Sequence, residues 1–252
     1  MHKYFAKTLF LGKKVEYLSE CQSTNQILSH QYQNQQLMEG HIIWADHQTN
    51  GKGQRGNVWL SEPGENLLFS ILLKPNTLLP KQAYLVNIVS GIAVIDCLNQ
   101  MFEATFELKW PNDVYVNDQK IAGILVETSI ESGRVGAATV GIGLNVNQKH
   151  FSIPTATSLY ILNGTTADRG SILEQLIISL EKYYLILKSG AISRLISDYY
   201  KVMRWRGELH TFEADRERFE GEIIGIDDTG RLLIRTNQKV RRFDVKEVKF
   251  LY

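Results

Sequence analysis

Residues 51–59, GKGQRGNVW, combine three glycines with the cations Lys52 and Arg55 and end on Trp59. Glycines let a backbone approach a ligand closely, and neighbouring cations favour a ligand that carries negative charge. No Lys-Ser or Lys-Thr pair closes the run, so it is not a Walker A phosphate loop. Alone, the stretch is equally compatible with a surface turn, and its function depends on what accompanies it.

Four further stretches carry polar groups or glycines that a ligand could use. STN at 23–25 supplies short polar side chains at the predicted start of a helix. KWPND at 109–113 sets lysine, asparagine and aspartate around a proline, which favours an extended turn at a strand end. KIAGILVE at 120–127 and GIGLNVN at 141–147 bring glycines into strands, where the missing side chain permits close approach of another group.

Each of these features also has a purely structural interpretation. Strand glycines commonly mark bulges or tight packing, Lys120 fits a solvated turn, and Trp59 and Trp110 fit a core. His47 has no second His, Cys or Asp at metal-ligand spacing. Neither a Ser/His/Asp nor a Cys/His arrangement can be argued, and the acidic residues show no pairing for two-carboxylate hydrolysis.

The length and composition of the chain limit the classes of protein to which it can belong. With 252 residues the chain can form one large domain, or a large one and a small one. The net charge of +1 argues against a protein whose main work is holding nucleic acid. Cys21 and Cys97 form no disulfide framework, which favours a reducing cytoplasm. The sequence shows no signal peptide and no stretch that approaches a membrane span.

The elements that position these stretches follow from apolar periodicity and turn residues. A cap signal near Ser23 begins a helix within 23–38. Further helices are predicted from Pro80 to about Met101 and near 170–188 and 190–203. Strands are predicted at 41–46, 66–74, 106–111, 114–130 and 134–147, with tight turns at Asn117-Asp118 and Ser132-Gly133.

The C-terminal tail changes character. Residues 218–252 read as short alternating strands, which are split by an Asp-Asp-Thr-Gly turn and an Asn-Gln turn. This pattern predicts a small all-β barrel that starts near residue 205. We therefore expect two domains, 1–204 and 205–252. Residues 201–252 hold 12 Lys and Arg against 10 Asp and Glu, which is too balanced for a surface that tracks phosphates.

The basic glycine loop, KWPND, Lys-x-x-Gly and GIGLNVN, in this order, resemble the biotin protein ligase (holocarboxylase synthetase) family. The resemblance covers essentially the whole chain from Ser23 to the barrel, and KWPND followed by KIAGILVE is its most specific part. It implies an α+β fold, in which a mixed β-sheet flanked by helices (class II synthetase-like) precedes a small SH3-like barrel. Because STN begins at residue 23, the resemblance implies a monofunctional form without the DNA-binding domain of larger members.

The resemblance also implies a reaction. Family members form biotinyl-5′-AMP from biotin and ATP with Mg²⁺, and then pass biotin to one lysine of a carrier domain. The biotin carboxylate is the nucleophile, so the protein needs none of its own. It must align the reactants and neutralise crowded negative charge. Lys120 is the first candidate, against the biotin carboxylate and the phosphate, and Lys52 and Arg55 are further candidate cations.

Other residues receive binding roles by the same resemblance. The biotin ureido group is assigned to Ser23, Thr24, Asn25 and Gln48, with Gly51, Gly53 and Gln54 nearby. The adenine side is assigned to Gly141, Gly143 and Asn145, with Trp59 as a stacking wall, and Gly123 is a further expected binding residue. Asn112 and Asp113 are expected to handle the metal or the incoming lysine amine. Family loops commonly have an arginine where this chain has Gln54, which bears on how tightly the adenylate is retained.

The expected partner is a biotin carboxyl carrier protein or domain. We expect a cytoplasmic monomer or homodimer that binds neither nucleic acid nor membranes. Two alternatives stay open from the residues: a lipoate or octanoate ligase of the same superfamily, and a non-catalytic protein that senses biotin or a nucleotide.

Overall fold

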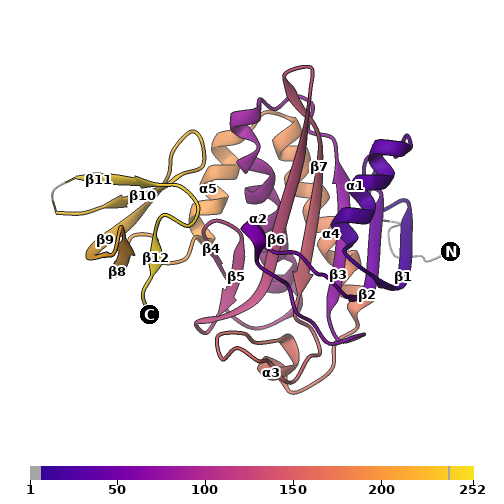
Figure 1. The fold of residues 1–252 in the computed structure, drawn as a ribbon, viewed down its shortest axis with the longest axis horizontal. Helices are drawn as coiled ribbons and strands as arrows, with labels where there is room; N and C mark the ends of the chain where they lie inside the picture. The colour runs from indigo at the N-terminus through magenta and orange to yellow at the C-terminus, as the bar shows by residue number, and fades with distance from the viewer. Residues whose placement is uncertain (1–6, 238) are drawn as a thin grey trace.

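The computed structural model describes residues 7–237 and 239–252, and leaves the side chain of Arg55 undescribed. A mixed sheet of seven strands forms the centre, in the order β1-β2-β3-β7-β6-β5-β4 (Figure 1). Only β1 and β2 pair in parallel, and the other neighbours are antiparallel. The strands are β1 (Val15–Cys21), β2 (Ile42–Gln48), β3 (Leu67–Leu73), β4 (Glu107–Lys109), β5 (Asp113–Val116), β6 (Gln119–Glu131) and β7 (Arg134–Leu144).

Helices cover both faces of this sheet. On one face α1 (Thr24–Asn34) buries Leu28 against Ile43 and Leu72. On the other face lie α2 (Tyr84–Met101), α4 (Arg169–Lys188) and α5 (Ile192–Val202), which share the main core with the sheet. A short helix, α3 (Leu159–Asn163), follows the sheet in the chain. The strand alternation therefore sends one set of side chains toward α2 and the opposite set toward α1.

The predicted hairpins are confirmed in detail. Asn117 and Asp118 have φ angles of 46° and 62°, and Ser132 and Gly133 have 49° and 76°. Two consecutive left-handed residues are the geometry of a type I′ turn, whose twist matches that of antiparallel strands. The first of these turns joins β5 to β6, so the strand that carries Asp113 is directly followed by the strand that carries Lys120.

The tail forms a second, antiparallel sheet in the order β11-β10-β9-β8-β12, as the predicted barrel requires (Figure 1). Its turn at Asp227–Gly230 is closed by the Asp227 carboxylate, which accepts from the backbone N–H of Thr229 and of Arg231. Residue 238 of the predicted Asn-Gln turn lies outside the described residues. The strands are β8 (Leu209–Ala214), β9 (Glu217–Ile226), β10 (Leu232–Arg235), β11 (Val240–Phe243) and β12 (Lys249–Phe250).

One strand and one α-helix were not predicted, and another α-helix ends earlier than expected. Strand β1 is an edge strand with a largely polar sequence, VEYLSEC, and α3 has five residues; both are weak signals. Helix α1 ends at Asn34 and not near residue 38, because Gln35 is already extended.

The segment that contains helix α2 bears on the expectation about membrane-spanning stretches. By length and composition alone, the segment Pro80–Met101 could cross a membrane, so the expectation that no stretch approaches a membrane span is wrong. However, 67% of its most apolar window is buried inside the fold, as in the core helix of a soluble protein. Its apolar residues pack against the sheet and α4.

Candidate functional site

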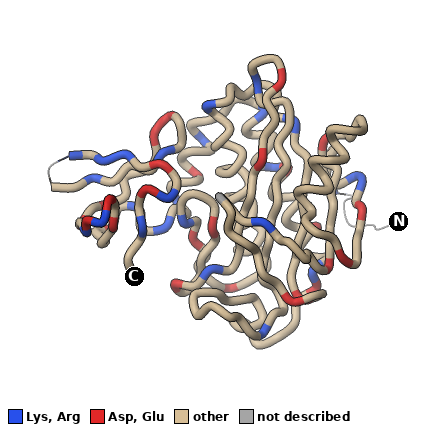
Figure 2. The backbone as a smooth tube through the Cα atoms, viewed as in Figure 1, with Lys and Arg blue, Asp and Glu red and all other residues tan. Residues whose placement is uncertain are grey.

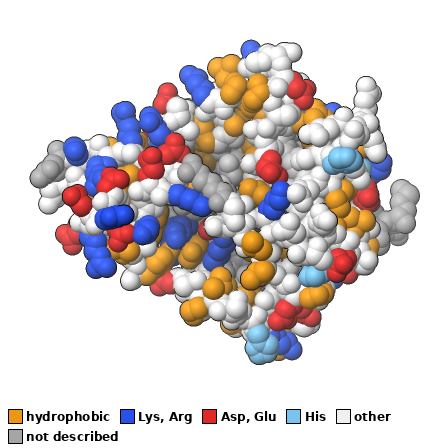
Figure 3. All heavy atoms as spheres, viewed as in Figure 1, with side chains coloured by type: hydrophobic (Ala, Val, Ile, Leu, Met, Phe, Trp, Pro, Cys, Tyr) orange, Lys and Arg blue, Asp and Glu red, His pale blue; other side chains and the backbone are white. Residues whose placement is uncertain are grey.

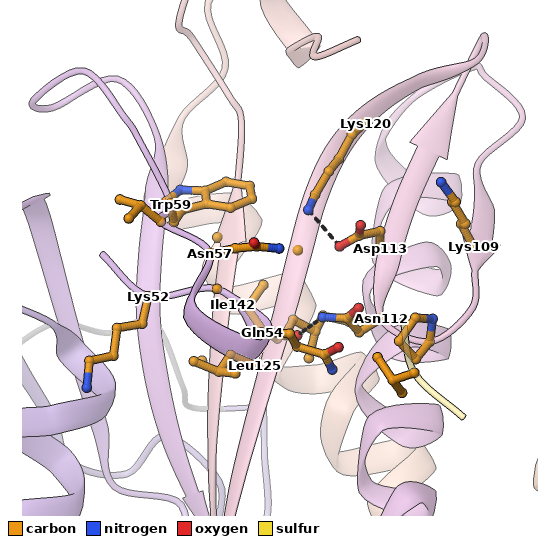
Figure 4. Close-up of a pocket in the computed structure, with 18 of the residues that line it drawn as sticks. Lys52, Gln54, Asn57, Trp59, Lys109, Asn112, Asp113, Lys120, Leu125 and Ile142 are labelled. Atoms are coloured by element: carbon orange, nitrogen blue, oxygen red, sulfur yellow. Dashed lines mark hydrogen bonds and ion pairs between the residues drawn. The ribbon is translucent and has the colours of Figure 1, made fainter. Parts of the chain in front are cut away.

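A cavity of about 490 Å³ lies on the sheet face that carries the start of α1, and most of the sequence-predicted residues line it (Figure 4). This volume is typical of small-molecule sites. The predicted residues on its wall are Ser23, Thr24, Asn25, Gln48, Lys52, Gly53, Gln54, Trp59, Asn112, Asp113, Lys120, Gly123, Gly141 and Gly143.

Two predicted residues lie behind the wall. A Cβ on Gly51 would come within 2.5 Å of the Trp59 carbonyl oxygen, so this glycine lets the two ends of the loop pack together. Asn145 is buried, and its side chain donates to the carbonyl oxygen of Thr157, which ties β7 to the following loop. The Arg55 side chain, predicted as a further cation of the site, lies outside the described part of the structure.

The glycine loop folds back on itself. Lys52 and Val58 form an antiparallel bridge, and the Trp59 N–H donates to the Gly51 carbonyl oxygen at 2.9 Å. Within this closure the Gly53 N–H donates to the Asn57 carbonyl oxygen at 2.7 Å. The loop thereby carries the Trp59 indole out over the ends of β6 and β7.

Two strand glycines make room for that indole. Gly123 and Gly143 are direct partners between β6 and β7. A Cβ would come within 2.9 Å of the Trp59 ring from Gly123 and within 2.6 Å from Gly143, closer than side-chain atoms pack. The third, Gly141, makes room for Asn25, whose Oδ1 would lie 2.3 Å from an added Cβ. The three glycines thus allow Trp59 and Asn25 to pack closely against the β6 and β7 strands at the cavity.

The STN segment is held by a chain of hydrogen bonds. Gln48 Oε1 accepts from the Thr24 N–H at 2.7 Å and from its hydroxyl at 3.0 Å. Asn25 Nδ2 donates to Glu127 Oε2 at 2.8 Å. Ser70 lies between the two, within hydrogen-bonding distance of both Thr24 and Asn25. Sequence reasoning did not single out Ser70, although a serine inside the apolar run NLLFSILLK was a signal that could have found it.

Lys120 and Asp113 form an ion pair at the far end of the cavity, with 2.7 Å between Nζ and Oδ1 (Figure 4). The side chains are 30% and 26% exposed, so water screens the pair only in part. Lys120 Nζ also lies 5.5 Å from the centroid of the Trp59 ring. Lys52 is exposed and points away from the pair (Figure 4). Lys120 is therefore the cation best placed to meet an anion beside the indole.

Residues that follow β11 in the C-terminal part of the chain form a part of the cavity wall that the sequence did not predict. Val245, Lys246, Val248, Lys249 and Phe250 line the cavity. Trp110 of KWPND donates its indole N–H to the Gly230 carbonyl oxygen at 3.0 Å, which joins the motif to the second sheet. Motif residues therefore serve both the site and the contact between the two sheets.

Lys109 is enclosed by aromatic rings. Its Nζ lies 5.0, 4.9 and 5.0 Å from the ring centroids of Tyr115, Phe250 and Tyr252, a cation–π arrangement. Burial, and then the neighbouring Tyr252 and Asp113, raise the pKa of Tyr115, so its phenol stays neutral. Two of the three rings, those of Phe250 and Tyr252, are far from KWPND in the sequence. The local sequence of the motif therefore does not predict this enclosure.

One cysteine, Cys21, lies next to a residue of the cavity wall. Cys21 pairs with Gln48 in the register of β1 and β2. Burial, and then the neighbouring Glu20, raise the pKa of its thiol to about 11, so it is protonated at neutral pH.

Charge is mixed over the surface. Lys and Arg are interspersed with Asp and Glu over the molecule, and much of the central sheet carries neither (Figure 2). On the face of Figure 3, basic side chains gather over the small domain, with acidic side chains among them.

Comparisons with known proteins agree on one family. Residues 18–145 match the model of the biotin/lipoate A/B protein ligase family, and residues 211–245 match the biotin protein ligase C-terminal domain. The bifunctional ligase/repressor BirA of Bacillus subtilis is 31% identical over 245 residues, which cover 95% of this chain and 75% of that protein. The biotin–[acetyl-CoA-carboxylase] ligase of Mycobacterium tuberculosis is 29% identical over 88% of this chain and 83% of its own.

Solved structures give the same result. Biotin protein ligase from Aquifex aeolicus in complex with biotin and ATP superposes with a TM-score of 0.78 at 28% identity, covering 95% of this chain and 100% of that one.

Proposed function

The chain belongs to the biotin/lipoate A/B protein ligase family, and we propose that it is a biotin protein ligase. It activates biotin with ATP to biotinyl-5′-AMP and then transfers biotin to a lysine of a carrier protein. The observation that carries this function is one cavity that joins three features. They are the Gln48–Thr24–Asn25 floor, the Trp59 indole over strand glycines, and the Lys120–Asp113 pair.

Activation needs alignment more than covalent chemistry from the protein. A biotin carboxylate oxygen attacks the α-phosphorus of ATP, the new O–P bond forms, and pyrophosphate leaves. Lys120 lies where it can hold both anions together and neutralise the charge that gathers as they meet. Ser23, Thr24, Asn25 and Gln48 hold the ureido end, and Trp59 with Gly123 and Gly143 forms the adenylate side.

Transfer uses the same pair. The carrier lysine attacks the acyl carbon, the C–O bond to AMP breaks, and AMP leaves. The amine must lose a proton, and Asp113 is the carboxylate on the cavity wall that can orient it or accept that proton.

Magnesium fits the residues present. In the described ranges 7–237 and 239–252, no three His, Cys, Asp or Glu side chains gather as a metal cage. Mg²⁺ does not need one, because it is bound through one or two carboxylates plus substrate phosphates. Asp113 and the neighbouring Asn112, whose amide is oriented by donation to the Ile124 carbonyl oxygen, are the ligands we propose. Bound there, Mg²⁺ would neutralise phosphate charge.

The same proposal extends to partners and compartment. The acceptor is a biotin carboxyl carrier protein or domain, and the enzyme acts as a monomer or homodimer in the cytoplasm. Two free cysteines and a charge-balanced small domain support a cytoplasmic role without nucleic acid or membrane. We propose 1–204 as the biotin- and ATP-binding domain and 205–252 as the SH3-like domain.

Biotinylation of a carrier domain tests the function. The protein, biotin and a purified biotin carboxyl carrier domain should give a product heavier by one biotin only when ATP and Mg²⁺ are both present, as measured by intact mass. Equal labelling with lipoate would favour the lipoate ligase alternative. Biotin binding without pyrophosphate release would favour the sensing protein.

Gln54 is predicted to set how long the adenylate is retained. It lines the cavity with a neutral amide. A charged donor there would add about 1 kcal/mol to a hydrogen bond with phosphate, or roughly five- to tenfold in an equilibrium. Gln54→Arg should therefore slow the escape of biotinyl-5′-AMP several-fold.

The measurement is the release rate of preformed radiolabelled adenylate in a chase without carrier. Gln119→Arg provides a control, since Gln119 lies outside the cavity wall and binds the loop carbonyl of Pro154. A release rate for Gln54→Arg that matches the control would show that other contacts hold the adenylate.

A further inference from the structure

Three oxygen atoms, two on the cavity floor and one beneath it, have fewer protons than their contacts require. Ser70 Oγ lies 2.7 Å from Thr24 Oγ1 and 2.6 Å from Asn25 Oδ1. A serine hydroxyl has a single proton, so it can donate to only one of these oxygens at a time. Ser70 is fully buried in β3, so bulk water cannot supply the missing donor.

The orientation of the Asn25 amide is fixed by its other partners. Its Nδ2 donates to Glu127 Oε2 at 2.8 Å and also faces the Leu125 carbonyl oxygen. A reversed amide would bring Oδ1 against the Glu127 carboxylate, where both atoms are acceptors. Oδ1 therefore faces Ser70 and requires a donor. Gly141, the cross-strand partner of Ser70, leaves the space in which this amide lies.

Two proton arrangements complete most of this network. In the first, Thr24 donates to Gln48 Oε1 and Ser70 donates to Thr24, so Asn25 Oδ1 receives no donor. In the second, Thr24 donates to Ser70 and Ser70 donates to Asn25, so Thr24 Oγ1 accepts nothing. Among the described residues, each arrangement therefore leaves one oxygen, of Asn25 or of Thr24, that accepts no hydrogen bond in this network. Both residues line the cavity.

We propose that Ser70 is a positioning residue that makes the floor select a ligand carrying an N–H group. Ser70 does not touch the ligand; it acts through Thr24 and Asn25, which line the cavity. The cyclic urea of biotin offers two N–H donors, whereas the dithiolane ring of lipoate offers none. The inference rests on the proposed biotin ligase function and locates its discrimination between the two acids in one buried hydroxyl.

Ser70→Ala tests this role. The variant removes the hydroxyl that lies between Thr24 Oγ1 and Asn25 Oδ1, so the two side chains are no longer joined through it and the preorganisation of these acceptors is lost. Losing a buried hydroxyl and leaving its partner unsatisfied should raise the biotin Kd and KM by about 5- to 50-fold. The kcat at saturating biotin and the KM for ATP should stay within about twofold of the parent. Ser70→Cys, which keeps a weak donor of similar size, should recover part of the loss.

One control variant and two biotin analogues distinguish a loss of ligand selection from general damage to the fold. Ser29→Ala removes a hydroxyl that donates to Thr139 Oγ1 at 3.1 Å outside the cavity wall, and should leave the biotin Kd unchanged. Desthiobiotin keeps the urea and lacks the sulfur ring, so it should lose as much affinity as biotin in Ser70→Ala. Tetrahydrothiophene pentanoic acid lacks the urea, so its inhibition constant should not depend on Ser70. Isothermal titration calorimetry and initial rates provide these values.

The outcomes are distinct. A folded Ser70→Ala protein that binds biotin within about twofold of the parent overturns the role of Ser70, as does an equal rise in the KM for ATP. A parent protein that does not bind biotin at all contradicts the proposed function instead.

Discussion

Lys120→Ala is expected to slow the formation of biotinyl-5′-AMP by roughly 30- to 1000-fold. The substitution removes a charge-assisted contact to anions in a partly dry site, which costs about 2–4 kcal/mol. The fold should survive, because the Lys120–Asp113 pair is partly exposed and such pairs add about 1 kcal/mol or less to stability. Pyrophosphate release with saturating biotin and ATP, together with a thermal melt, measures both effects.

Lys149→Ala is the matched control for this prediction. Lys149 Nζ lies 4.6 Å from the centroid of the Tyr160 ring, as Lys120 lies over Trp59, but it is not part of the cavity wall. Its loss should leave adenylate formation unchanged. A Lys120→Ala enzyme that makes adenylate within about threefold of the parent rate would remove Lys120 from the reaction.

Gly143→Ala should slow adenylate formation by about 10- to 100-fold, because small displacements of aligned reactants have effects of this size. The added Cβ would lie 2.6 Å from the Trp59 ring, so the indole and the loop that carries it must shift. We expect the KM for ATP to rise more than the KM for biotin, since Trp59 forms the adenylate side.

Gly136→Ala makes the same change on the same strand. There the Cβ meets only the end of the flexible Glu131 side chain, which can move aside. This control should keep parental kinetics. Parental kinetics in Gly143→Ala as well would mean that the position of Trp59 does not matter for ATP.

Local signals predicted the elements that carry the motifs. The hairpin turns at Asn117-Asp118 and Ser132-Gly133 were predictable because left-handed backbone and hairpin twist favour those residues. Helix α2 was predictable from the helical spacing of its large apolar residues, which are buried, although the helix also buries residues on nearly every other side. Strand β1 was missed because an edge strand needs little apolar sequence, and its pairing with β2 is a long-range event.

The site was predictable only as far as its motifs reach. The resemblance named residues of STN, the glycine loop, KWPND and the strand glycines, and the fold brings most of them to one cavity. The sequence did not show why glycine is needed at these strand positions. In the structure, Gly141 makes room for Asn25, and Gly143 makes room for Trp59. The wall from the small domain was missed because residues 245–250 meet the motif only through tertiary packing.

The ring enclosure around Lys109 has an electrostatic consequence. A lysine held by a carboxylate forms a pair with no net charge, as Lys120 does with Asp113. Lys109 lies over three aromatic rings instead of a carboxylate, so its positive charge adds to the potential inside the cavity. A polyanionic nucleotide would then be drawn in from solution, and its association rate should fall as ionic strength rises and the Debye length shortens. We therefore expect the rings of Tyr115, Phe250 and Tyr252 to affect the rate at which the nucleotide binds and not the steps of the reaction.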